Sequence, residues 1–223
     1  MPLNLPPAGL LQAWRHTATK PSSALVLPDG CCDLIVHSAV HQTPRWFVTS
    51  LADGPHTVQS AGGERYQGYR FLPGARIDIA GLLQVMRQSP HVNDAGCDDA
   101  DVLPWIDAFV SVDVRVADAL SSLADAPTIG CATRRLGVSE RSLERLMTKA
   151  TGRSPGFWKS LARVRRAARA LSDPVPLAAI AADHGFSDQA HLSRECRRWL
   201  GLSPSQLRQT PDVLAVLAES GYG

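Results

Sequence analysis

Short apolar runs alternate with clusters of Gly, Pro and Asp along the first third of the chain. Such runs, bounded by turn-forming residues, are typical of β-strands. Pro28-Asp29-Gly30 and Pro73-Gly74 are two of the turn signals. The pattern predicts a small antiparallel sheet or barrel with strands at 24–27, 33–37, 45–49, 56–59 and 65–72.

After residue 78 the apolar positions follow helical spacing. Residues 79–88 predict a short helix, and residues 104–124 predict a longer one with Pro104 in its first turn. Ala126-Pro127 then marks a boundary. The apolar stripe of the longer helix consists of Ile106, Phe109, Val110, Val114, Ala117, Leu120 and Leu123.

An internal repeat occupies the part of the chain that follows this boundary. Gly137 and Ser139 lie 48 residues before Gly185 and Ser187. Further along the repeat the interval is 49 residues, so the one-residue shift falls at the start of the second helix of each copy. This longer interval relates Leu143, Arg145, Gly152, Ser154 and Pro155 to Leu192, Arg194, Gly201, Ser203 and Pro204.

Each copy of the repeat predicts a helix, a tight turn and a second helix. Gly137 and Gly185 suit the left-handed conformation that closes a first helix, and Ser139 and Ser187 suit the N-cap of a second one. Phe186 is expected in the core. The predicted inward face of the second copy's first helix is Leu177, Ile180 and Ala181. The inward faces of the second helices are Leu143, Leu146 and Met147 in one copy and Leu192, Cys196 and Trp199 in the other.

Between the copies, Ser154 and Pro155 predict the start of a connecting helix, with Ser as the cap and Pro in the first position. This helix should run to about residue 172 and stop at Asp173-Pro174. A rigid helix here would hold the two copies at a fixed separation. Four arginines make it strongly basic: Arg163, Arg165, Arg166 and Arg169.

Charge divides the chain in the same way as the hydrophobic pattern. The 223 residues carry a net charge of only +2, yet residues 128–210 hold 15 Lys and Arg against 6 Asp and Glu. Residues 1–127 hold 8 against 13. This asymmetry indicates a half that binds a polyanion, joined to a half with another task.

The repeat and the connecting helix carry a resemblance to a known family. Three stretches resemble the AraC/XylS family of bacterial regulators. They are the run from Gly137-Val138-Ser139 to Ser154-Pro155, the helix with Arg163 and Ala167, and the run from Gly185-Phe186-Ser187 to Ser203-Pro204. The resemblance implies a double helix-turn-helix domain whose two recognition helices enter major grooves on one side of the DNA. The family usually has an aromatic residue where this chain has Met147, Leu192 and Cys196; the replacements remain apolar, and Cys196 is expected to leave the second copy less well packed.

The resemblance and the outward direction of the side chains together select candidate DNA-binding residues. Arginine suits guanine and glutamine suits adenine, because each can form two hydrogen bonds with a base edge. Glu144 could accept from cytosine or pair with a neighbouring arginine. Arg163 is assigned a structural role between helix ends. The candidates for base contact are Arg141, Glu144, Arg145, Gln189, His191, Ser193 and Arg194, and those for phosphate contact are Lys149, Arg153, Arg197 and Arg198.

These observations predict an α+β chain in four parts. They are a β-rich sensing or dimerisation domain at 1–78, a helical connector at 79–126, an all-α DNA-binding domain with two helix-turn-helix units at 127–210, and a tail at 211–223. The expected partner is double-stranded DNA, and RNA polymerase, a small-molecule effector and a second copy of the chain are further candidates. No membrane segment, signal peptide, metal or cofactor is predicted, so the expected location is the cytoplasm.

The N-terminal half leaves several functions open. Pro28 to Ile35 and Arg70 to Ala75 resemble a small domain that precedes the same DNA-binding unit in some AraC-type regulators, which implies sensing or dimerisation. The alternatives are a regulator without a ligand, a redox or metal sensor that uses Cys31-Cys32 or His37 and His41, and a thiol-based DNA-repair enzyme fused to the DNA-binding unit. The five Cys lack a C-x-x-C pair, which argues against a structural zinc site or a disulfide framework.

Overall fold

The computed structural model describes residues 7–89 and 97–223 and divides the chain into two compact units. The first unit, the sheet unit, comprises residues 1–23, 31–50 and 59–114. The second, the helical unit, comprises residues 24–30, 51–58 and 115–223. The helical unit thus includes two segments from the N-terminal part of the sequence.

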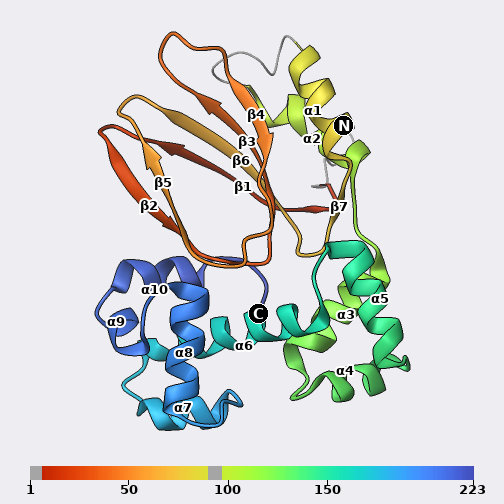
Figure 1. Ribbon diagram of the computed structural model, residues 1–223. Helices are drawn as coiled ribbons and strands as arrows, with labels where there is room; N and C mark the ends of the chain where they lie inside the picture. The colour runs from red at the N-terminus through yellow and green to blue at the C-terminus, as the bar shows by residue number, and fades with distance from the viewer. Residues whose placement is uncertain (1–6, 90–96) are drawn as a thin grey trace. The chain divides into compact units, whose positions relative to one another are not determined.

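An antiparallel four-stranded sheet forms the centre of the sheet unit (Figure 1). In the order β1-β6-β3-β4, its strands are Leu10–Thr17, Arg65–Phe71, Asp33–Ser38 and Arg45–Val48. Tyr69 lies opposite Ala13 on one side and Leu34 on the other. Two-stranded sheets pair β2 (Ser22–Val26) with β5 (His56–Ser60) and β7 (Arg76–Ile77) with β8 (Val110–Ser111).

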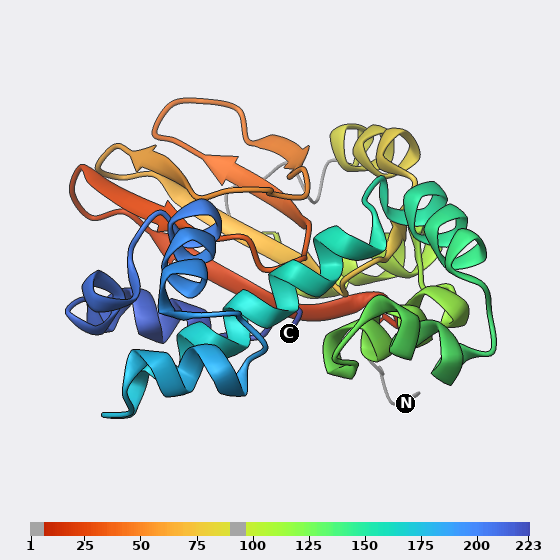
Figure 2. The same cartoon turned by 60° about the horizontal axis from the view of Figure 1, so that its bottom comes forward.

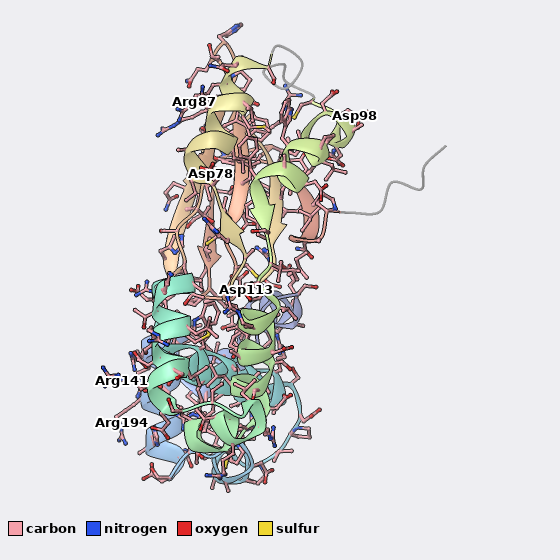
Figure 3. The ribbon with its side chains drawn as sticks, turned by 90° about the vertical axis from the view of Figure 1, so that its right-hand side faces the viewer. Asp78, Arg87, Asp98, Asp113, Arg141 and Arg194 are labelled. Atoms are coloured by element: carbon pink, nitrogen blue, oxygen red, sulfur yellow. The ribbon has the colours of Figure 1, made fainter. Side chains whose placement is uncertain are left out.

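Two helices supply the rest of the core of the sheet unit, α1 (Ile79–Gln88) and α2 (Asp99–Phe109). Each starts at an aspartate, Asp78 or Asp98, whose side chain accepts a backbone N–H of the first turn (Figure 3). Because side chains alternate between the faces of a strand, every second residue of β3 and β6 faces this core. The buried cluster contains Leu34, Val36, Tyr69, Phe71, Leu82, Met86, Val102 and Ile106.

The strands expected from residue 24 onward and the helix at 79–88 are confirmed, with end positions shifted by up to two residues. Strand β1 was not expected. Its apolar residues do not alternate cleanly, and Trp14 is held by a specific contact: its Nε1 donates to the Asp33 carboxylate at 2.8 Å. The ring also covers Gly68, where a Cβ would lie 2.1 Å from the nearest ring atom.

The single helix expected over residues 104–124 is wrong. The structure contains α2, the short strand β8 and then α3 (Val114–Asp125). Pro104 lies inside α2 rather than in a first turn, because Asp98 caps the helix earlier. The apolar stripe that suggested one helix serves two cores: Ile106 is buried in the sheet unit, and Leu120 is buried in the helical unit.

The helical unit is built around a long central helix, α6 (Pro155–Arg169), which a 3-10 turn at Ala170–Ser172 extends (Figure 2). Helices α4 and α5 lie on one side of it, and α7 and α8 lie on the other. The remaining helices are α4 (Ile129–Leu136), α5 (Glu140–Thr151), α7 (Leu177–Asp183), α8 (Gln189–Leu200), α9 (Pro204–Arg208) and α10 (Pro211–Ala218).

The C-terminal residues are part of the core of the helical unit. The Tyr222 hydroxyl is buried and donates to the Leu120 carbonyl at 2.9 Å, and the Tyr222 ring packs edge-on against Trp158 of α6. Arg165 of α6 is also buried and donates to the carbonyls of Pro28 and Glu219. A buried guanidinium is tolerated because carbonyl oxygens accept its hydrogen bonds.

The two units divide the chain differently from the four expected segments. The boundary at residues 114 and 115 falls within the expected connector at 79–126, and the expected tail at 211–223 forms α10 and part of a core. The reason is that long-range packing assigns α2 to one core and α3 to the other. No helix in the described part of the chain is long and apolar enough to cross a membrane.

Candidate nucleic-acid interface

The first helix-turn-helix unit consists of α4 and α5. The Thr128 side chain caps α4 by accepting the Cys131 N–H at 3.1 Å. The chain then turns at Gly137, whose φ of 66° is unfavourable for other residues. Ser139 caps α5 by accepting the Ser142 N–H at 3.1 Å. The expected glycine turn and serine cap are both confirmed.

The second unit consists of α7 and α8, and its turn is one residue longer. Gly185 has a φ of 71°, as expected. The N-cap of α8 is Asp188, which accepts the His191 N–H at 2.6 Å, so the expectation that Ser187 caps this helix is wrong. Asp188 follows Ser139 by 49 residues whereas Gly185 follows Gly137 by 48, so the extra residue lies in the turn.

Helices α5 and α8, which we call the recognition helices, present most of the candidate residues to solvent. The apolar faces point inward as expected: Leu143, Met147, Leu192, Cys196 and Trp199 are buried, and Leu146 is partly buried against the same core. In Figure 3, Arg141 of α5 and Arg194 of α8 project from the same side of the helical unit. The exposed candidates are Arg141, Glu144, Arg145 and Lys149 on α5 and Gln189, Arg194, Arg197 and Arg198 on α8.

Two candidates on α8, His191 and Ser193, are only partly exposed. The His191 ring lies edge-on to the Phe186 ring, with 5.3 Å between their centres, and its Nδ1 lies 3.1 Å from the Ser187 hydroxyl. Because these contacts hold the ring against the turn, His191 helps to fix the start of α8. The sequence did not indicate this local role.

Glu144 is positioned by its own helix. Its carboxylate accepts a hydrogen bond from the Thr148 hydroxyl at 3.4 Å. Among the residues that the structure describes, Glu144 forms no ion pair with Arg141 or Arg145, the pairing considered from the sequence. Its carboxylate therefore stays on the exposed face of α5.

Two expected phosphate contacts are engaged within the protein. Arg153 donates to the Asp53 carboxylate at 3.1 Å and to the Leu51 carbonyl at 3.2 Å, both within the helical unit. Arg198 forms an ion pair with Glu195 at 3.7 Å and lies over the Trp199 ring. Lys149 and Arg197, near the C-terminal ends of the two recognition helices, are exposed and form no ion pair with another residue that the structure describes.

Arg163 of α6 has the structural place expected for it. Its guanidinium donates to the Gly185 carbonyl at 3.1 Å and lies 4.5 Å from the centre of the Phe186 ring. A cation over an aromatic face is attracted by the ring's electrons. Arg163 therefore holds the turn of the second unit against the central helix.

Titratable groups of the two helix-turn-helix units lie in different environments, which shift their pKa values in different directions. The hydrogen bond from the His191 backbone lowers the pKa of Asp188, and nearby Arg194 adds to the effect. Burial raises the pKa of the Cys196 thiol to about 12, so this thiol stays protonated and behaves as a small apolar group. On α4, by contrast, the hydrogen bond with Thr128 lowers the pKa of the Cys131 thiol.

The remaining cysteines lie in different environments from those of Cys131 and Cys196. All five cysteines lie in the described part of the chain, and none forms a disulfide. Cys31 and Cys32 precede β3 in a loop rather than occupying a strand; Cys31 is buried, and Cys32 is packed against the sheet-unit core. The described residues contain no group of three His, Cys, Asp or Glu side chains that could hold a metal ion.

Comparison with known proteins places the helical unit in a family. A family model described as a helix-turn-helix domain matches residues 132–210. The DNA-binding domain of AdpA, a global transcriptional factor solved in complex with a target DNA, is 30% identical over 44% of this chain and 88% of that domain, with a TM-score of 0.38. The chain belongs to the AraC family.

Other solved structures are also similar. A probable AraC family transcriptional regulator from Rhodopseudomonas palustris is 26% identical over 44% of this chain and 96% of that one, with a TM-score of 0.39. ToxT from Vibrio cholerae is 10% identical over 94% of this chain and 98% of its own, with a TM-score of 0.44. No curated protein sequence matches this chain.

Proposed function

We propose that this protein is a sequence-specific transcription regulator whose recognition helices α5 and α8 enter adjacent major grooves of double-stranded DNA. The observation that carries the proposal is the pairing of these helices across α6, with Arg141 and Arg194 projecting from one side. Two helices that read one face of the duplex must be about one helical turn, ~34 Å, apart. A continuous central helix is suited to maintaining such a separation.

The exposed side chains provide the chemistry for reading and holding DNA. Arg141, Arg145 and Arg194 can each donate two hydrogen bonds to guanine, and Gln189 can pair with adenine. Glu144 can accept from the amino group of cytosine. Lys149 and Arg197 are proposed to contact phosphates, which adds affinity without sequence information. Ser193 and His191, which are less exposed, complete the proposed surface of α8.

Selection of bound sites from random double-stranded DNA by the full chain tests this function. We expect a single enriched pattern with two separated halves, and titration should show tighter binding to the selected site than to a scrambled duplex. The double variant Arg145→Ala, Arg194→Ala should lose the preference and keep its fold. Equal binding of the wild-type chain to selected and scrambled DNA would exclude sequence-specific recognition.

For the sheet unit we propose that it binds a small-molecule effector or a second copy of the chain. An open pocket of about 370 Å³ lies wholly within this unit and supports effector binding. Arg15, Gln67 and Cys97 are among the lining residues. Beside it, Asp99 accepts hydrogen bonds from Arg15, Gln67 and Tyr69 at 2.8 to 2.9 Å.

A thermal-shift screen with metabolites tests the effector proposal, with Gln67→Ala as the pocket variant. We expect a stabilising compound whose effect disappears in the variant. A concentration-dependent sedimentation profile with no stabilising compound would favour the second copy instead.

We propose no catalytic role for the chain. We propose that the protein is located in the cytoplasm, and RNA polymerase is a further candidate partner.

A further inference from the structure

A segment from the N-terminal part of the sequence lies within the helical unit. This segment, Leu51–Val58, which we call the strap, follows β4 in the sequence and includes the first residues of β5. Leu51 packs against the core that contains Trp158 and Trp199. The strap therefore belongs by its packing to the part of the molecule that carries the recognition helices.

One contact of the strap is made just beyond the C-terminal end of α5. Gly152 ends this helix, and Arg153 follows it. Arg153 donates to the Leu51 carbonyl at 3.2 Å and to the Asp53 carboxylate at 3.1 Å. A guanidinium that binds a backbone carbonyl and a carboxylate at once is restricted in direction as well as in position. The strap thus fixes the chain where it leaves the first recognition helix.

A second contact is made at the C-terminal end of α8, where Gly201 ends the helix with a φ of 76°. Pro55 lies so close that a Cβ at Gly201 would be 3.1 Å from the proline Cγ. A Cβ at Gly54 would lie 3.9 Å from the carbonyl oxygen of Arg198, in the last turn of α8. The strap is therefore packed directly against the end of the second recognition helix.

The two contact points correspond to one another in the internal repeat, because Gly201 follows Gly152 by 49 residues. Side chains of the helical unit also link them. The Arg153 guanidinium lies 5.0 Å from the centre of the Phe157 ring, and Phe157 packs edge-on against Trp199 of α8 at 5.1 Å. The strap and this row of side chains thus join equivalent ends of α5 and α8.

We propose that the strap is a positioning element that sets the distance between the recognition helices and thereby the spacing of the two DNA segments that the protein prefers. Asp53 and Arg153 act at one end, and Pro55 with Gly201 acts at the other. The inference rests on the proposed function, because it assumes that α5 and α8 both read DNA. One base pair of spacing moves the second segment by ~3.4 Å and rotates it about the duplex axis, so a fixed pair of helices should tolerate little change.

The experiment measures spacing preference rather than affinity alone. A site selected by the wild-type chain is compared with duplexes that carry one base pair more or one less between its two halves. For the wild-type chain we expect the altered spacings to weaken binding on the order of tenfold. For Asp53→Ala and for Pro55→Ala we expect a smaller penalty, because the helix ends can then shift to meet the altered site.

A double-mutant cycle separates positioning from direct phosphate contact. If Asp53 and Arg153 act as a pair, Arg153→Ala should reduce the spacing penalty as Asp53→Ala does, and the double variant should add little further. If Arg153 contacted a phosphate, Arg153→Ala would weaken binding at every spacing and reduce its salt dependence, and Asp53→Ala would not; that result would overturn the proposal. Asp53→Asn provides a milder variant should alanine impair folding.

Thr57→Ala is the matched control, because Thr57 lies in the same segment and is exposed. It should keep the wild-type spacing penalty, and thermal unfolding should show that all variants are folded. Unchanged spacing penalties in Asp53→Ala and Pro55→Ala would overturn the positioning role while leaving the proposed function intact. Failure of the wild-type chain to select any site would instead contradict the proposed function itself.

Discussion

In the first helix-turn-helix unit the turn is open to solvent, because Val138, the residue after the turn glycine, is 42% exposed. In the second unit Phe186, the residue after the turn glycine, is only 5% exposed and lies between Arg163 and His191. The two turns have the same glycine conformation. They differ in what they pack against.

The additional residue in the second turn accounts for this difference. In the first unit a single residue, Val138, separates the glycine from the cap. In the second unit Phe186 and Ser187 both precede the cap, so one can enter the core while the other remains at the surface. The first unit is fixed elsewhere: the Trp158 ring nitrogen donates to Thr151 at 3.0 Å, at the end of α5. The second unit is thus anchored at its turn as well as at the end of α8, whereas the first is anchored at the end of α5.

The largest expected effect comes from removing the anchor of the second turn. Phe186→Ala should lower the free energy of unfolding by about 3–5 kcal/mol, because it leaves a cavity in the core and removes the contacts with Arg163 and His191. Val138→Ala is the matched change in the first unit and should stay within about 0.5 kcal/mol. Urea unfolding followed by circular dichroism measures both, and comparable losses would contradict the difference between the turns.

Much of this comparison could be predicted from the sequence. Local rules of spacing and residue type predict the glycine conformations, the Ser139 and Ser154 caps and the inward faces of the recognition helices. The structure confirms these predictions. The choice between Ser187 and Asp188 as the cap could not be made in this way, because both residue types cap helices well. The longer turn places Asp188 within reach of the His191 N–H.

Contacts between distant residues explain the remaining differences. The prediction of one helix over 104–124 combined apolar residues that belong to two cores, since periodicity does not show which core a residue enters. The resemblance and the expected outward direction made Arg153 a candidate phosphate contact. Its partner Asp53 is 100 residues away in the sequence, and no local pattern relates the two.

The next largest effects concern DNA and distinguish the two recognition helices. Arg145 and Arg194 hold equivalent positions, 49 residues apart. Each change to alanine should weaken binding by about 1–3 kcal/mol and relax specificity at one position. The relaxed positions should lie in different halves of the selected site. Titrations against single-base substitutions in each half measure this, and relaxation in the same half would show that the two helices do not read separate grooves.

A smaller effect distinguishes phosphate contact from base contact within the first helix-turn-helix unit. Lys149→Ala should weaken binding to all sequences alike and reduce the slope of log affinity against log salt by about 1, because one fewer phosphate is neutralised. Arg145→Ala on the same helix provides the contrast, since its loss should depend on sequence. Titration of selected and scrambled duplexes at several salt concentrations tests both variants. A loss confined to the selected duplex would reassign Lys149 to base contact.

The smallest effect follows from the two different caps. The hydrogen bond from the His191 backbone lowers the pKa of Asp188 in the folded protein, so the charged cap stabilises the fold above the unfolded pKa of about 3.9. This stability is lost as the pH falls through the lower folded pKa. Ser139 does not titrate, and the first cap should therefore be independent of pH in this range.

Exchanging the caps tests this directly. Asp188→Ser should be less stable than the wild-type protein at neutral pH, and the difference should shrink as the pH falls below about 4. Ser139→Asp should introduce the same pH dependence into the first unit, because its carboxylate would accept the Ser142 N–H that the hydroxyl accepts now. Unfolding midpoints of the wild-type protein and of each variant, measured across the acid range, give both differences in stability. The contributions of the other carboxylates are the same in each pair of proteins and largely cancel in the difference. A wild-type advantage over Asp188→Ser that persisted undiminished at low pH would mean that shape, and not charge, makes Asp188 the cap of the second unit.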